Sequence, residues 1–137
     1  MFETRLQTYW ADADAAGIVF FTNFFRFVQC AEEDLFRAAG TEMMVLYDEH
    51  QLLMPRVESF SKFMKPIRVG GAIFIQLRAR FKGEKTVRLE FTILNVEDRS
   101  LLAEGYLVVV CVDRRTGHSC PMPPAIREVY LRAAPAD

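Results

Sequence analysis

The sequence has only three cysteines among its 137 residues, and none belongs to a Cys-x-x-Cys motif. An odd, unpatterned set of thiols argues against both a disulfide framework and a zinc site. Cys30 falls within a predicted helix near its apolar face, where a free cysteine usually serves as a small buried side chain. The scarcity of thiols favours a reducing compartment, and we expect a cytoplasmic protein.

An excess of either charge is also lacking, since 17 basic residues balance 18 acidic ones. No block of lysines and arginines interleaves with aromatic residues, so nucleic acid is not an expected partner. No apolar stretch approaches the roughly 20 residues of a membrane span, and the charged N-terminus lacks the apolar core of a signal peptide. We therefore expect no membrane partner either.

Histidine is scarce, which limits the catalysts that the chain can build. His50 and His118 fall in a predicted loop and a predicted turn, and no Gly-x-Ser-x-Gly motif accompanies them. A Ser-His-Asp or Cys-His catalyst is therefore not indicated. The sequence also has neither a histidine cluster nor a calcium-loop pattern, so we expect no bound metal.

Apolar residues, in contrast, make up 51% of the chain and include 12 phenylalanines, enough for one domain over residues 1–137 with a substantial core. Hydrophobic periodicity predicts strands over 2–10, 73–81, 87–93 and 101–112, an extended segment over 52–64, and helices over 24–39, 43–49 and 124–131. A hairpin turn is predicted at Lys82-Gly83-Glu84-Lys85. This order predicts an α+β domain whose antiparallel sheet packs on one long helix, and not a doubly wound fold.

The long helix is predicted to begin after Asn23, a favourable N-cap residue. Its apolar residues recur at helical spacing and predict one buried face: Phe24, Phe27, Val28, Ala31, Leu35 and Ala38. Glu32, Glu33 and Arg37 fall between these positions. We assign these three charged residues to the solvent side of the helix.

Two aspartates precede this helix, in the segment Asp12-Ala13-Asp14-Ala15-Ala16-Gly17. The unpaired N–H groups at a helix N-terminus attract negative charge and can stabilise an oxyanion. Asp14, followed by a glycine that permits a sharp turn, is therefore a candidate nucleophile or general base. Asp12 is expected to face the same way on extended backbone, where it either shares this task or braces the loop. Ordinary turn chemistry is the alternative for both.

Basic residues on or beside the predicted hairpin offer a second kind of site. Lys82, Lys85 and Arg88 are suited to phosphate contacts, as point charges or as a guanidinium fork. A solvated turn explains the same residues equally well.

The segment from Tyr9 to Phe24, YWADADAAGIVFFTNF, resembles the signature of hotdog-fold acyl-CoA thioesterases of the 4-hydroxybenzoyl-CoA thioesterase family. The passage Lys65-Pro66-Ile67-Arg68-Val69-Gly70-Gly71 is similar to the family's bend before the long strands, although an acidic residue is common where Gly71 stands. The predicted order of elements agrees with this family over nearly the whole chain.

The resemblance implies a hotdog fold, in which a sheet of about five strands wraps around one long central helix. It also implies a homodimer paired edge to edge, with active sites at the interface, and further association into a homotetramer. No cofactor is implied, because CoA is part of the substrate.

The resemblance also assigns roles to individual residues. Asp14 matches the catalytic carboxylate, and the backbone N–H of Phe21 matches the donor that polarises the thioester carbonyl. The implied substrate-binding residues are Gly17 in the loop, Phe24 and Val28 in the acyl pocket, and Lys85 with its neighbours Lys82 and Arg88 at the CoA phosphates.

Some members of the superfamily carry a histidine where Phe21 stands. The absence of this histidine places the chain nearer the branch of the superfamily that acts on aromatic acyl groups. We therefore predict a thioester hydrolase that converts an acyl-CoA with an aromatic or bulky acyl group to the free acid and CoA. One alternative is a thioesterase for a polyketide or fatty acyl chain on an acyl carrier protein. Others are a hotdog hydratase or dehydratase and a non-catalytic module that binds acyl thioesters.

Overall fold

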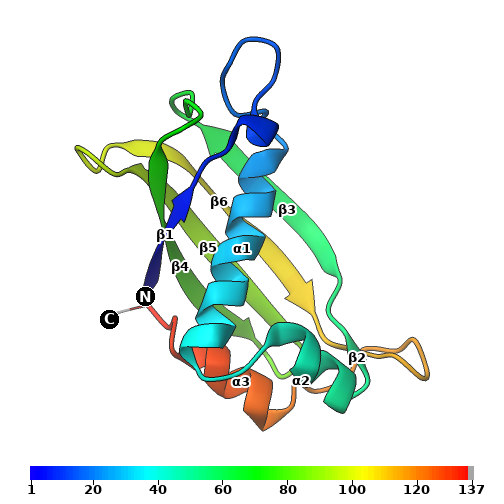
Figure 1. The fold of residues 1–137 in the computed structure, drawn as a ribbon. Helices are drawn as coiled ribbons and strands as arrows, with labels where there is room; N and C mark the ends of the chain where they lie inside the picture. The colour runs from blue at the N-terminus through cyan, green and yellow to red at the C-terminus, as the bar shows by residue number, and fades with distance from the viewer. Residues whose placement is uncertain (136–137) are drawn as a thin grey trace.

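The computed structural model describes residues 1–135 and contains a curved antiparallel sheet with one long helix, α1 (Asn23–Ala38), across its concave face (Figure 1). The strand order across the sheet is β1 (Phe2–Gln7), β4 (Ala72–Lys82), β5 (Thr86–Asn95), β6 (Leu101–Val110) and β3 (Arg56–Phe63). The predicted α+β architecture with about five strands is therefore confirmed. No helix within this range is long and apolar enough to cross a membrane.

Shorter elements close the end of the sheet where α1 finishes. They are the helices α2 (Met43–Glu49) and α3 (Pro124–Leu131) and a small sheet of β2 (Leu52–Leu53) with β7 (Val112–Asp113). Both helices have the bounds that the sequence predicts. The first strand is shorter than predicted, because the N–H of Asp12 donates to the carbonyl of Tyr9 at 2.9 Å and begins a single 3-10 turn, η1 (Trp10–Asp12).

The core lies between α1 and the concave face of the sheet. Alternate residues of β4 and β5 point toward the helix and are buried: Ile73, Ile75, Leu77, Ala79, Val87, Leu89, Phe91 and Ile93. The predicted apolar face of α1 is buried as well, apart from Ala38, which is exposed at the last turn. The alternation of apolar and polar residues thus fixes which face of the sheet receives the helix.

Two further predictions for α1 are wrong. Asn23 is not the N-cap: that position is Thr22, and the Asn23 amide instead donates to the carbonyl of Asp12 at 2.9 Å. Glu32 is not on the solvent side, because its side chain is completely buried. In each case a polar partner distant in sequence decides the outcome.

Gly105 in β6 makes room for the neighbouring edge strand. A Cβ atom there would lie 1.9 Å from the carbonyl oxygen of Phe60 and 2.8 Å from Cζ of Phe91. We expect Gly105→Ala to lower the free energy of unfolding by about 2–3 kcal/mol, since the backbone must move to relieve this overlap. Urea unfolding measures the change, with Gly71→Ala as the control, because its Cβ would meet nothing nearer than 3.9 Å. Equal stability of the two variants would contradict this account.

Candidate active site

The acidic loop between η1 and α1 is a tight turn closed by backbone hydrogen bonds. Ala13 pairs with Val19, the N–H of Asp14 donates to the carbonyl of Ile18 at 2.9 Å, and the N–H of Gly17 donates to the carbonyl of Asp14 at 3.1 Å. Gly17 has a φ of +78°, a left-handed conformation that glycine adopts without strain. The sharp turn that presents Asp14 therefore depends on this glycine.

Asp14 is exposed, and only one of its two carboxylate oxygens is engaged. Oδ1 accepts the backbone N–H of Ala16 at 2.8 Å, which fixes the side chain against its own turn. Oδ2 has no hydrogen-bond partner within residues 1–135. The arrangement holds the carboxylate in place while leaving one oxygen free to attack an acyl carbon or accept a proton from water.

Asp12 has a different environment, with a relative exposure of only 4%. Its carboxylate accepts the N–H of Tyr9 at 2.8 Å and forms an ion pair with Arg26 of α1. Its carbonyl accepts the N–H of Phe20 at 2.9 Å. Asp12 thus ties the loop to the helix, and the expectation that both aspartates face the same way is wrong because the 3-10 turn interrupts the extended backbone.

A free backbone donor lies at the end of the same loop. The N–H of Phe21 has no hydrogen-bond partner within residues 1–135, and it stands just before the first turn of α1. The unpaired N–H groups of the first helical turn carry the positive end of the helix dipole, and Phe21 lies directly before the N-cap, Thr22. The amide is therefore available to a developing oxyanion.

An apolar cavity of about 260 Å³ adjoins this donor, between the acidic loop and the end of β3. Phe21, Phe24 and Phe63 line it, and their rings meet edge to face, with centroids 6.2 Å apart for Phe21 and Phe63 and 4.8 Å apart for Phe24 and Phe63. Aromatic rings in such geometry readily accept a further ring. Of the two predicted pocket residues, Phe24 lines the cavity, whereas Val28 is fully buried in the core.

The predicted phosphate contacts lie at the opposite end of the sheet. Lys82 and Lys85 are exposed on the β4–β5 hairpin, while Arg88 stacks on the ring of Tyr106 and pairs with Glu90 at 3.4 Å. β4 begins beside the acidic loop and ends at Lys82 (Figure 1), a span of roughly 33 Å at the usual rise per residue. A single chain therefore does not bring the hairpin and Asp14 together.

A second cavity, of about 460 Å³, runs between α1 and β3 and was not predicted from the sequence. Arg56 of β3 lines it and forms an ion pair with the buried Glu32, whose carboxylate also accepts the hydroxyl of Tyr130 at 2.7 Å. Burial raises the pKa of the Glu32 carboxyl, and the charge of Arg56 opposes this shift. Arg56 and Tyr130 lie 24 and 98 residues from Glu32 in the sequence, so no local sequence pattern predicts these contacts.

Cys30 lines the cavity between α1 and β3, but neither the cysteines nor the histidines line the aromatic cavity beside Phe21. Burial raises the pKa of the Cys111 thiol to about 12, and burial also raises the pKa of Cys30, so both thiols are poor nucleophiles. His50 and His118 are exposed at the end of the molecule where α2 and β7 lie. Within residues 1–135, no three histidine, cysteine or acidic side chains are grouped to hold a metal ion.

The fold and its known relatives identify a thioesterase of the hotdog type. Residues 8–129 match the family model of the thioesterase-like superfamily, and the chain belongs to this family. The predicted family, the hotdog fold and the enzyme class, thioester hydrolase, are therefore confirmed.

Individual relatives match nearly the whole length of the chain. A 1,4-dihydroxy-2-naphthoyl-CoA hydrolase from Picosynechococcus sp. is 29% identical over 135 residues, which cover 96% of this chain and 92% of the relative. The crystal structure of a 1,4-dihydroxy-2-naphthoyl-CoA thioesterase from Synechocystis superposes with a TM-score of 0.88 at 22% identity, covering 95% of each chain. A gentisyl-coenzyme A thioesterase gives a TM-score of 0.80 at 24% identity, covering 94% of this chain and 99% of the other.

Proposed function

We propose that this protein hydrolyses an aromatic acyl-CoA to the free acid and CoA, with Asp14 and the amide of Phe21 as its catalytic groups. The observation that carries the proposal is the Asp14 carboxylate, which has one oxygen hydrogen-bonded to its own turn and one oxygen free. The loop that holds it ends at the unpaired N–H of Phe21, and an aromatic cavity adjoins this N–H. The names of the relatives add support, since both the naphthoyl and the gentisyl groups are hydroxylated aromatic acids.

These groups can hydrolyse a thioester by two mechanisms. In the first, Oδ2 of Asp14 attacks the thioester carbon, the C–S bond breaks, CoA leaves as the thiolate, and water then hydrolyses the mixed anhydride. In the second, Asp14 removes a proton from water, the water oxygen attacks the same carbon, the C–S bond breaks, and CoA leaves as the thiol once its sulfur has taken up that proton. In both, the N–H of Phe21 donates to the carbonyl oxygen as it gains negative charge. Only the first predicts a transient protein species heavier by the acyl group.

A second copy of the chain completes the proposed site. β3 is an edge strand of eight residues whose outer edge pairs with no strand in residues 1–135, and Val57, Phe60 and Phe63 are exposed along it. A long edge strand with unpaired backbone groups and exposed apolar side chains can pair with another strand. If the β3 strands of two copies pair antiparallel, the sheets of the two copies run in opposite directions. The β4–β5 hairpin of one copy then lies toward the end of the other copy that carries Asp14.

The edge pairing predicts a specific loss on mutation. Val57→Lys combined with Ser59→Lys adds two positive charges to this edge in each copy, so the paired strands repel each other, and we expect a monomer with kcat/KM lowered at least about tenfold. Sedimentation velocity measures the mass and a thiol-release assay the activity. Met44→Lys with Val45→Lys on the exposed side of α2 is the matched control. A wild-type protein that sediments as a monomer would refute the pairing.

The substrate class is tested by comparing kcat/KM for benzoyl-, hydroxybenzoyl- and naphthoyl-CoA with values for acetyl-, hexanoyl- and palmitoyl-CoA. We expect the aromatic esters to be preferred at least about tenfold, since one methylene or ring contact in an apolar pocket is worth about 1–3 kcal/mol. An acyl carrier protein loaded with the same acyl group tests the carrier alternative. Hydration of an enoyl-CoA without thiol release would instead identify a hydratase.

A further inference from the structure

Arg5 on β1 and Arg68 in the connection before β4 differ from every other arginine in residues 1–135. Their guanidinium groups make no hydrogen bond, ion pair or ring contact in this part of the chain, although the backbone of both residues is hydrogen-bonded. The other arginines each have a carboxylate, amide, carbonyl or ring partner. Two guanidinium groups thus remain available to a ligand.

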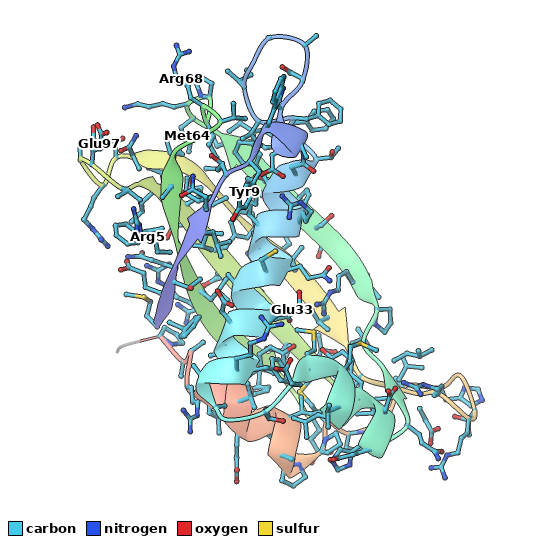
Figure 2. The ribbon with its side chains drawn as sticks, in the orientation of Figure 1. Arg5, Tyr9, Glu33, Met64, Arg68 and Glu97 are labelled. Carbon is cyan, nitrogen blue, oxygen red and sulfur yellow. The ribbon has the colours of Figure 1, made fainter. Side chains whose placement is uncertain are left out.

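Both arginines line the same cavity, of about 670 Å³, at one end of the sheet. Thr8 joins their segments, because its N–H and hydroxyl both donate to the carbonyl of Gly71, at 2.9 and 2.8 Å. Glu97, from the turn between β5 and β6, is the acidic residue of the lining. Figure 2 labels these residues on three segments: Arg5 midway along β1, Arg68 in the connection before β4, and Glu97 at the turn between β5 and β6. The cavity therefore keeps a net positive charge.

The cavity adjoins the candidate active site. Pro66 lines both this cavity and the aromatic cavity beside Phe21. Arg68 pairs with Ile18, whose carbonyl in turn accepts the N–H of Asp14. At the usual spacing of paired strands, the backbone of Arg68 is about 10 Å from that of Asp14.

We propose that Arg5 and Arg68 form a phosphate-binding subsite for the CoA part of the substrate, in the same chain that supplies Asp14. The inference rests on the proposed function and deepens it. Guanidinium groups bind phosphate oxygens in pairs, and their exposure lets both side chains turn toward a ligand. A thioester whose acyl group occupies the aromatic cavity then extends past Pro66 toward the two arginines. The β4–β5 hairpin, at the far end of the sheet, is not required for this contact.

The test is a double variant, Arg5→Gln with Arg68→Gln, assayed on an aromatic acyl-CoA and on the N-acetylcysteamine thioester of the same acid, which carries no phosphate. We expect KM for the CoA ester to rise about 10- to 100-fold, the usual effect of losing charge-assisted hydrogen bonds. KM for the truncated ester should change less than about twofold, because it lacks the group that the arginines bind. Arg37→Gln with Arg115→Gln removes the same charge from distant surface sites and is the control.

Calorimetric titration with CoA and with inorganic pyrophosphate tests binding independently of catalysis. Weaker CoA binding by the double variant supports the subsite even if the wild-type protein hydrolyses no thioester, an outcome that would refute only the proposed function. Unchanged KM and CoA affinity would overturn the subsite and leave the proposed function intact. Equal affinity of the protein for pyrophosphate and CoA would overturn the assignment of the subsite to CoA. The same holds if CoA affinity falls only in the double variant Lys82→Gln with Lys85→Gln.

Discussion

Asp14→Asn is expected to lower kcat for an aromatic acyl-CoA by about 10²- to 10⁴-fold, the usual contribution of a positioned carboxylate. Asparagine can still accept the N–H of Ala16 through its side-chain oxygen, so the turn is retained and only the nucleophilic or basic oxygen is lost. Because Asp14 is exposed, the free energy of unfolding should change by less than about 0.5 kcal/mol. Steady-state thiol release and urea unfolding measure the two effects.

Asp113 provides a matched control for this variant. Its carboxylate accepts the N–H of Arg115 at 2.8 Å, two residues on, as that of Asp14 accepts the N–H of Ala16. It lies in β7, which pairs with β2 at the other end of the molecule, where Figure 1 labels β2. Asp113→Asn should therefore leave kcat unchanged within about twofold. Equal turnover by the Asp14 and Asp113 variants would remove Asp14 from the mechanism.

Glu32→Ala is expected to lower the free energy of unfolding by about 3–5 kcal/mol, because it leaves Arg56 without its buried counter-charge. The hydroxyl of Tyr130 also loses its acceptor at 2.7 Å. Urea or thermal unfolding measures the loss. Glu33→Ala, the next residue along α1, is the control, since its contact with Arg37 is a partly exposed 3.9 Å pair and should contribute less than about 0.5 kcal/mol.

The double variant Glu32→Met with Arg56→Met separates the ion pair from the packing. Apolar residues of similar volume often replace a buried ion pair with little loss, so we expect stability within about 1–2 kcal/mol of the wild-type protein. Recovery relative to Glu32→Ala would show that the unpaired charge is the main cost. A double variant no more stable than Glu32→Ala would contradict this explanation.

Sequence patterns predicted the elements whose causes are local. The period of apolar residues defined the long helix and the consecutive strands β4, β5 and β6, and Pro124 marked the start of α3 as a first-turn proline. Glu32 could not be placed in this way, because a helical position between apolar faces is equally suited to solvent and to a buried partner. Its burial depends on Arg56 and Tyr130, which only the folded chain brings to α1.

The candidate site was predictable where it is continuous in sequence. The loop around Asp14 and Gly17 is a single segment, so its turn and its position before a helix were visible in the residues. The different environments of Asp12 and Asp14 were not visible, since they depend on Arg26 and on a short 3-10 turn. Arg5 and Arg68 lie 63 residues apart and meet at one cavity only because β1 pairs with β4.

A single-turnover assay tests the central claim most directly. The wild-type protein and the Asp14→Asn variant are each mixed in excess with a hydroxylated naphthoyl-CoA, and release of the CoA thiol is measured over time. We expect the wild-type protein to release one thiol per substrate and the variant to do so at least about 10²-fold more slowly. Absence of thiol release by the wild-type protein, or equal rates for both proteins, would contradict the assignment of Asp14 as the catalytic carboxylate of an aromatic acyl-CoA thioesterase.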